Sequence, residues 1–421
     1  MTAGTNPPSP TPPSTTTEPK PVVRRRRGRS GLYVAVGVVI IVAILVGVGY
    51  STSWFGLQHT STSTGTACTK GITLQGDGAQ IVAPLMAAWT AASSSGSYPS
   101  QTSNQVNYPA SGSGTGLTHF TSSSIDFAVT DDPLTPAERT DMPGQALTLP
   151  FVGGALTIIY NLPGTTGHLN LTGALLAEIY LGNITMWDDP AIAAINSGIT
   201  LPAATITTVH RSDSAGTTYV LSDFLSQSSP YWSSHPGKGI SISFPGAPKQ
   251  TAEKGNSLMI STVTGNPNTI GYSDLTDVLA AASPPQYAAI QNPTGHFIVP
   301  TLANTISAID DKVATTKIPL SAGDWFNVSM VNANGSTDYP VATFIYMYVY
   351  QATDKGFSPT LTKSQVLVQW LHWTLTSGQG LVDESQPTQL YYAPLPASII
   401  SVDDAGIQTM TFNGAAIPSC T

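Results

Sequence analysis

Three loops rich in glycine and hydroxyl residues each follow a strand-like run and precede a helix-like one. They are QGDGAQIVAP (75–84), YPASGSGTG (108–116) and HRSDSAGTT (210–218). Glycine lets the backbone approach a ligand closely. The helix that follows offers unpaired N–H groups and the positive end of its dipole. The chemistry that such loops suit is the binding of an oxyanion.

Arg211 is the most informative residue of the third loop. Beyond residue 30 the chain has only two arginines, Arg139 and Arg211. A guanidinium group matches an oxyanion with two parallel hydrogen bonds, and Asp213 is close enough in the sequence to orient it. The alternative is a surface Arg–Asp pair that contributes little. Arg139, within PAERTD, has the pattern of a solvent-facing helix residue.

A fourth segment, FAVTDDPL (127–134), places Asp131 at the end of a strand-like run. Asp-Asp-Pro is also good turn chemistry, which is the alternative interpretation. As part of a site, a buried carboxylate accepts a hydrogen bond from a protonated oxygen. Phosphate keeps a proton at neutral pH and sulfate does not, so Asp131 would favour phosphate, because the wrong anion leaves a buried group unpaired.

The sequence carries no recognisable catalytic or metal-binding motif. Its seven histidines form no H-E-x-x-H pair, and no G-x-x-x-x-G-K-[ST] loop is present for ATP. GSGTG (112–116) is not a G-x-S-x-G elbow, because its middle residue is Gly114. We therefore predict a binding protein with no catalytic residue, no metal ion and no cofactor.

The charge is distributed unevenly along the chain. Residues 1–30 hold six basic residues and one acid, whereas the remainder holds ten basic and 23 acidic residues. An acidic body does not suit a nucleic-acid partner, which needs clustered Lys and Arg. Because the net charge of the body is negative, an anion must be held by a few hydrogen-bond donors that surround it locally.

The elements that would position these loops begin near residue 70. With 421 residues the chain is long enough for two lobes. Short apolar runs alternate with helical segments, which is typical of an α/β fold with a mostly parallel sheet. Strands are predicted at 155–161, 204–210 and 343–351, and helices with i, i+3, i+4 apolar spacing at 174–182, 219–226 and 364–378.

The first 70 residues predict three different segments. Residues 1–30 predict a disordered, basic cytoplasmic tail. Residues 31–50 contain no charge and have the length of a transmembrane helix, and the basic run before them places the N-terminus in the cytoplasm. A cleaved signal peptide is the alternative, although no A-x-A site follows. Residues 51–70 predict a Ser/Thr-rich stalk, so the body would lie outside the cell membrane.

The two cysteines, Cys68 and Cys420, lie at the two ends of the predicted folded body. We predict a disulfide between them, which would tie the two ends of the body together in an exported protein. Two unpaired thiols near the chain ends are the alternative.

Seven segments together resemble the phosphate-binding component of phosphate ABC importers. They are GDGAQIVAPL, VNYPASGSGTG, DFAVTDDPL, LAEIYLGNITMWDDPAI, VHRSDSAGTTYVLSDFLS, IGYSD and YAPLP, and they run from about Gly71 to Pro396. The resemblance implies a two-lobed periplasmic-binding-protein fold of the venus-flytrap, type II kind. Residues 71–150 and 339–421 would form lobe I and residues 151–338 lobe II. It also implies inorganic phosphate as ligand, and ABC permease and ATPase subunits as partners.

The resemblance also implies a set of site residues. Those that would bind phosphate are Gln80, Ile81, Ser113, Asp131, Arg211, Gly216 and Thr217, with Asp213 and Ala215 in supporting positions. Asp131 would accept the phosphate proton and Asp213 would orient Arg211. The family usually has Thr-Phe where this chain has Gln80-Ile81, and Ser where it has Ala215. Two hydroxyl donors are thereby lost, each worth about 0.5–1.5 kcal/mol.

Three other interpretations remain at this point. The pocket could take a related oxyanion, or it could serve a secreted phosphatase-like enzyme. A tethered sensor that kept the fold and lost transport is the third. The enzyme would need an activated nucleophile or a metal cluster, which no motif indicates.

Overall fold

The computed structural model describes residues 69–419, apart from 93, 247–248, 384 and 386–388. These residues belong to one compact unit, Gly65–Thr421. The predicted tail and membrane anchor, nearly all of the stalk, and both Cys68 and Cys420 lie outside the described residues. In the described part of the chain, no helix is both long enough and apolar enough to cross a membrane.

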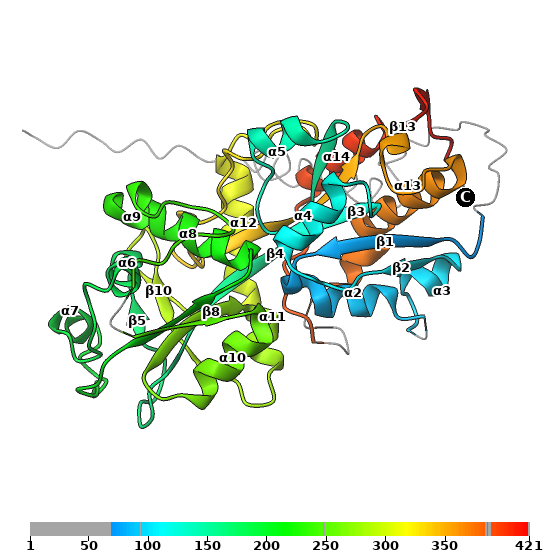
Figure 1. The fold of residues 1–421 in the computed structure, drawn as a ribbon. Coiled ribbons are helices and arrows are strands. Elements are labelled where there is room, and N and C mark those ends of the chain that lie inside the picture. The colour runs from blue at the N-terminus through cyan, green and yellow to red at the C-terminus, as the bar shows by residue number, and fades with distance from the viewer. Residues whose placement is uncertain (1–68, 93, 247–248, 384, 386–388, 420–421) are drawn as a thin grey trace, which may run out of the picture. The chain divides into compact units, whose positions relative to one another are not determined.

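One mixed sheet of nine strands runs through this body (Figure 1). Its order is β2 (Gln105–Asn107), β1 (Thr73–Gly78), β3 (Phe127–Thr130), β12 (Ala342–Tyr350), β4 (Ala146–Asn161), β8 (Thr269–Asp274), β6 (Thr207–Arg211) and β7 (Gln250–Glu253), with β9 (Gln286–Tyr287) also paired to β4. The outer strands are parallel to one another on each side, β1 to β2 and β3, and β6 to β7 and β8. The central strands β4 and β12 are antiparallel to their neighbours. The prediction of a mostly parallel sheet therefore holds only for the outer strands.

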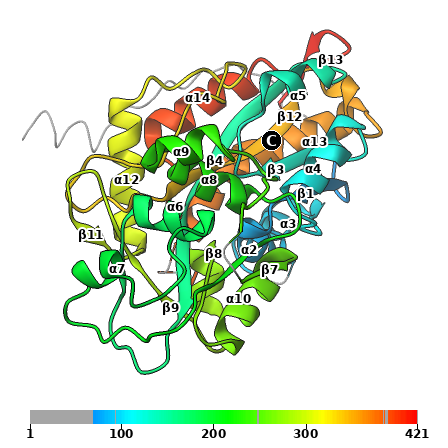
Figure 2. The same cartoon turned by 60° about the vertical axis from the view of Figure 1, so that its left-hand side comes forward.

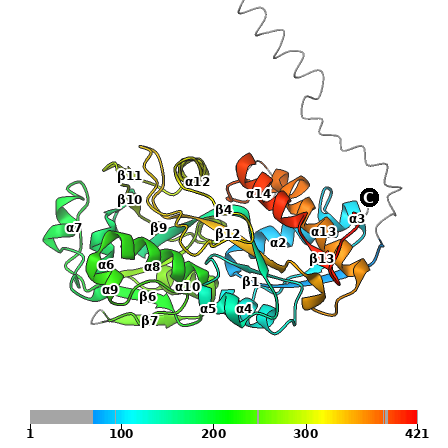
Figure 3. The ribbon, with the colours of Figure 1, turned by 90° about the horizontal axis from the view of Figure 1, so that it is seen from above.

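Strand β4 passes from one half of the body to the other. Residues Ala146–Ala155 pair with β12, and Leu156–Asn161 pair with β8. All but the last of its residues are buried, as expected of a strand covered on both faces. In Figure 3, β4 and β12 pass between the half that contains β6 and β7 and the half that contains β1 and α13.

Two separate hydrophobic cores divide the body into two lobes. The first core contains Leu74, Phe127 and Trp370, and the second contains Val209 and Tyr272. The chain crosses between the cores in β4, close to the predicted boundary after residue 150. Residues 151–338 were predicted to form lobe II, but within that range Leu302, Ile309 and Trp325 pack in the first core.

Helices cover both lobes. The first lobe carries α2 (Ala83–Thr90), α3 (Tyr98–Thr102), α4 (Ser113–Thr121), α5 (Pro136–Asp141), α13 (Leu361–Leu375) and α14 (Ala397–Ile407). The second carries α6 (Gly173–Leu181), α7 (Pro190–Ala194), α8 (Gly216–Ser228), α9 (Pro230–Ser234), α10 (Gly255–Gly265) and α11 (Leu275–Ala280). Helix α12 (Leu302–Thr315) packs against β4 and β12, and α13 packs against α14 (Figure 2).

Local chemistry explains where these helices begin and end. The Thr360 side chain accepts from the Lys363 N–H and caps α13, and Thr135 forms a capping box with Glu138 at α5. Gly182, with a φ of 81°, ends α6 in the left-handed conformation that glycine adopts most easily. The predicted strands and helices are all present. Strand β4 begins well before residue 155, and α13 ends at Leu375 and not at Gly378.

Candidate functional site

Four helix N-termini meet around one small pocket between the lobes. The first lobe contributes the 3₁₀ turn η1 (Gln80–Val82), which leads into α2, and helix α4; the second contributes α8 and α10. The pocket is lined by Gln80, Ile81, Gly112, Ser113, Asp131, Arg211, Ala215, Gly216, Thr217 and Asn256. All seven predicted ligand residues and Ala215 are among them.

Arg211 ends strand β6 and is buried, with a side chain only 3% exposed. Its Nε and Nη2 donate to the two carboxylate oxygens of Asp213 at 2.7 and 2.6 Å. Burial raises the pKa of Asp213, but the hydrogen bonds and charge of Arg211 outweigh this and hold that pKa below its usual value. Asp213 does not line the pocket; it fixes the plane of the guanidinium, as predicted for a supporting residue.

The other terminal nitrogen of Arg211 faces the second lobe's helix ends. Nη1 donates to the Thr217 Oγ1 at 3.1 Å and to the Asn256 Oδ1 at 2.6 Å. Four of the five N–H bonds of the guanidinium are thus engaged by side chains of the same lobe. The group is held in one orientation before any ligand arrives.

Backbone N–H groups from both lobes belong to residues that line the pocket. In the described residues no acceptor is found for the N–H groups of Gln80, Ile81 or Thr217. These groups stand at helix starts, where intrahelical acceptors are lacking. Across the lobes, the Gly216 N–H donates to the Ser113 Oγ at 3.1 Å. The site therefore offers several backbone N–H donors and one positive charge, the Arg211 guanidinium, which is held in a fixed orientation.

Asp131 supplies the acceptor. It directly follows β3, is 1% exposed, and its Oδ1 has no hydrogen-bond partner among the described residues. Burial raises the pKa of Asp131 to about 7, against the lowering effect of Arg211. A buried carboxyl without a partner is costly, so a ligand that donates a hydrogen bond here would relieve that cost.

Comparison with known proteins places the chain in a family. Residues 58–376 match the model of the PBP superfamily domain. The phosphate-binding protein PstS of Xylella fastidiosa (strain 9a5c) is 32% identical over 338 residues, which cover 80% of this chain and 85% of that protein. The phosphate-binding protein PstS of Pasteurella multocida (strain Pm70) is 32% identical over 339 residues, with 80% and 90% covered. The chain belongs to the PstS family.

Solved structures agree on the fold. A high affinity periplasmic phosphate-binding protein (PfluDING), bound with phosphate, has a TM-score of 0.59 at 17% identity, covering 82% of this chain and 100% of that chain. The phosphate-binding protein from Stenotrophomonas maltophilia has a TM-score of 0.58 at 19% identity, with 80% and 94% covered. At these identities the likeness establishes the two-lobed periplasmic-binding-protein fold alone.

Gln80 and Ala215 are the two positions at which the resemblance predicted the loss of a hydroxyl donor. The Gln80 Oε1 accepts from the backbone N–H of Asn256, another residue that lines the pocket, at 3.0 Å. Ala215 is buried, and its N–H donates to the Ile240 carbonyl at 2.9 Å. The backbone N–H of Ala215 is therefore used within the second lobe.

Asn256 is a pocket residue that the sequence reasoning missed. Its Nδ2 donates to the Asp274 Oδ2 at 2.6 Å and to the Asp277 Oδ2 at 2.9 Å, behind Arg211. The sequence does contain a pattern that could have predicted this residue. The segment KGN (254–256) follows β7 and leads into α10, so it repeats the strand–glycine–helix pattern of the other loops. Strand β7 alternates exposed and half-buried residues and lacks an apolar run, so the pattern was inconspicuous.

Arg139 differs from its prediction. It is partly buried rather than solvent-facing, its Nη2 donates to the Thr148 Oγ1 at 2.9 Å, and its Nε is buried with no partner among the described residues. The residue lies on α5 and does not line the pocket. It is part of the first lobe's packing.

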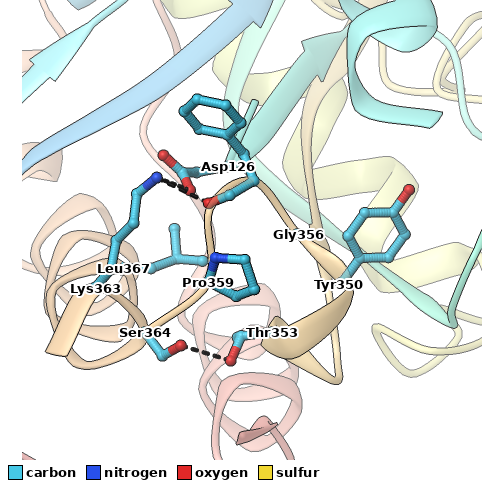
Figure 4. Close-up of a pocket in the computed structure, with 9 residues that line it drawn as sticks. Asp126, Tyr350, Thr353, Gly356, Pro359, Lys363, Ser364 and Leu367 are labelled. Carbon is cyan, nitrogen blue, oxygen red and sulfur yellow. Dashed lines mark hydrogen bonds and ion pairs between the residues drawn. The ribbon is translucent and has the colours of Figure 1, made fainter. Parts of the chain in front are cut away.

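A second small pocket lies in the first lobe, beside the loop that follows β12 (Figure 4). Its one cation, the Lys363 Nζ, lies 2.8 Å from the Asp126 Oδ1 and donates to the Phe357 carbonyl at 2.9 Å. Thr353 and Ser364 bond to each other across the same pocket. The two charged side chains that line this pocket are therefore paired with each other within the first lobe.

Proposed function

We propose that this chain is the extracytoplasmic substrate-binding component of a phosphate ABC importer. The observation that carries the proposal is that one pocket is lined both by a pre-oriented Arg211 and by Asp131, whose Oδ1 has no hydrogen-bond partner among the described residues. Phosphate near neutral pH combines negative oxygens with one proton. The pocket provides donors for the former and an acceptor for the latter.

The relatives support this choice of anion. The curated PstS proteins that the chain matches are phosphate-binding proteins, and it covers 85% and 90% of two of them. Backbone N–H groups survive any change of side chain, so the substitution of Gln80 and Ala215 for hydroxyl residues leaves most of the predicted donors. Arsenate, which has the same shape and protonation chemistry, is expected to bind as well.

A binding role suits the pocket better than a hydrolytic one. Of the described residues that line it, none is a histidine, cysteine or lysine, and Asp131 supplies its one carboxyl. Hydrolysis of an ester would need an activated nucleophile beside a base. The chain would instead close its lobes on the anion and deliver it to permease and ATPase subunits.

We further propose that residues 31–50 anchor the protein in the cell membrane by a single pass, with the N-terminus in the cytoplasm. The support is sequence alone, namely the uncharged run and the basic residues Arg24–Arg29 before it. Alkaline extraction of membranes should leave the full-length protein in the pellet and release a variant lacking 31–50. Release of both would exclude the anchor.

Isothermal titration of residues 66–421 with phosphate, arsenate, sulfate and molybdate tests the ligand. Heat with phosphate and arsenate, and none with sulfate, is expected. Absence of phosphate heat, or tighter sulfate binding, would overturn the proposal. Turnover of a chromogenic phosphate ester would favour the enzyme instead.

A further inference from the structure

Gln80 and Asn256 line two pockets at once. One is the buried pocket around Arg211; the other is a neighbouring, wider pocket lined also by Lys254, Gly255 and Leu258. Lys254 and Leu258 are exposed, and the Leu258 side chain is 51% exposed. The wider pocket is therefore an outer vestibule, and the contact between Gln80 and Asn256 forms the wall that separates it from the inner pocket.

This wall joins the two lobes. Gln80 begins η1, next to Ile81 in the first core, whereas Asn256 lies in the first turn of α10, which packs in the second core through Met259 and Val263. The Gln80 Oε1 accepts from the Asn256 N–H at 3.0 Å. Since the acceptor and the donor belong to different lobes, this hydrogen bond exists only while the lobes are closed.

Gly255 makes room for the contact. A β-carbon built on Gly255 would stand 2.8 Å from the Gln80 Oε1, and the φ of Gly255 is 79°, a value that glycine adopts most easily. The amide oxygen of Gln80 thus lies directly on the N-terminus of α10, where the helix dipole favours a partial negative charge.

Asn256 is held ready for this contact by the anion site itself. Its Oδ1 accepts from the Arg211 Nη1 at 2.6 Å, and its Nδ2 donates to Asp274 and Asp277. The polar atoms of the Asn256 side chain are therefore all engaged within the second lobe. The backbone N–H that faces Gln80 is fixed by the same network that orients Arg211.

We propose that Gln80 is a gate residue, which latches the first lobe onto α10 and closes the path from the vestibule to the anion pocket. The gate rests on the proposed function for the identity of the anion, but not for its own existence. It acts on the open–closed equilibrium of the lobes and not on the choice between anions. Loss of the latch should therefore speed release of the anion without changing selectivity.

The test compares Gln80→Leu with Gln101→Leu. Leucine keeps most of the length of glutamine and removes the acceptor. The Gln101 Oε1 also accepts a neutral N–H, from the Trp373 Nε1 at 2.7 Å, but within the first lobe. One neutral hydrogen bond corresponds to a change in release rate of about 2- to 10-fold. Stopped-flow release of phosphate should be faster by that factor in Gln80→Leu and unchanged in Gln101→Leu.

A second measurement is hydrogen exchange at the Asn256 amide, which should be faster in Gln80→Leu than in the parent protein when both are saturated with phosphate. Equal exchange in the two saturated proteins, or a changed ratio of phosphate to sulfate affinity, would overturn the gate. If the parent binds no phosphate, the proposed function fails, and the same comparison with whichever of arsenate, sulfate or molybdate binds still decides the gate.

Discussion

Asp131 of the first lobe lies directly against Gly216 of the second. A β-carbon built on Gly216 would stand 2.4 Å from the Asp131 Cγ and 2.6 Å from its Oδ1. The approach brings a buried carboxyl to the first residue of α8, whose N–H donates to the Ser113 Oγ of the first lobe. Closure of the lobes around the pocket therefore depends on the absence of a side chain at position 216.

Replacing Gly216 with alanine should obstruct this closure. The new methyl group cannot occupy the space of Asp131, and over-packing of this kind costs about 1–3 kcal/mol. Phosphate affinity should fall by that amount, or roughly 5- to 150-fold, in a calorimetric titration, while each lobe stays folded. Gly198→Ala is the matched control, since a β-carbon there has nothing within 4 Å. Equal affinities for parent and Gly216→Ala would contradict the closed arrangement.

The substitution Arg211→Lys keeps the positive charge and removes the planar guanidinium group, which can form two parallel hydrogen bonds. Lysine cannot reproduce the two bonds to Asp213 together with those to Thr217 and Asn256. A hydrogen bond to a charged group contributes about 1.5–3 kcal/mol, so the loss of even one of these bonds should weaken binding at least about 10-fold. Arg139→Lys makes the same chemical change on α5, away from the pocket, and should leave the phosphate isotherm as it is. If both variants bind like the parent, Arg211 is not a ligand.

Asp131→Asn should change the anion preference. The amide can donate where the carboxylate only accepted, so sulfate no longer faces a buried unpaired charge. The ratio of the phosphate affinity to the sulfate affinity should fall roughly 10- to 150-fold, which corresponds to about 1.5–3 kcal/mol of binding free energy. Asp132→Asn is the neighbour control, because Asp132 does not line the pocket. Competition titrations measure both ratios, and an unchanged ratio in Asp131→Asn would remove this residue from the discrimination.

The sequence predicted the residues that line the pocket better than the topology of the sheet around it. The loops that hold Ser113, Arg211 and Gly216 were found because each stands at a strand–glycine–helix junction, whereas the roles of Ser113 and Gly216 were implied by the family resemblance. Strands β1 and β3 run in the direction of β4 and strands β6 and β8 run against it, so the carboxyl ends of the two sets face each other between the lobes. The direction of Gln80 could not be found in this way, since its side chain depends on Gly255 of the other lobe, which is distant in the sequence. The antiparallel centre of the sheet was missed for a similar reason, because the residues that β4 and β12 pair lie 187 (342 − 155) to 204 (350 − 146) positions apart in the sequence, and no local pattern records such a pairing.

The division of the chain between the lobes was also beyond local patterns. Helix α12 has an apolar face that could cover either sheet half. A β-carbon built on Gly153 of β4 would stand 2.1 Å from the Ile309 Cδ1, so the side chain of Ile309 fills the space that this glycine leaves. The lobe that a helix joins thus depends on which sheet surface has room for its apolar side chains. Residues 302–330 pack in the first core because β4 provides such room at Gly153.

A buried acid pair behind Arg211 should make stability depend on pH. Burial, and then the charge of Asp277, hold the pKa of Asp274 well above its usual value. Burial also raises the pKa of Asp277, although hydrogen bonds from Asp274 and Asn256 oppose it. The folded protein thus keeps a proton that the unfolded chain releases above about pH 4. Stability is therefore full below that pH and falls as the pH rises through the folded-state values.

Asp277→Asn should flatten this dependence, because the amide resembles a permanently protonated Asp277. Urea unfolding at pH 4, 6 and 8 should show little difference at pH 4 and a more stable variant at pH 8. The slope of the free energy of unfolding should be reduced by up to about 1.4 kcal/mol per pH unit, the value for one proton. Asp310→Asn, on the exposed face of α12, should follow the parent at every pH. Parallel profiles for parent and Asp277→Asn would mean that the pair holds no extra proton, and Asn256 would then donate to two charged carboxylates.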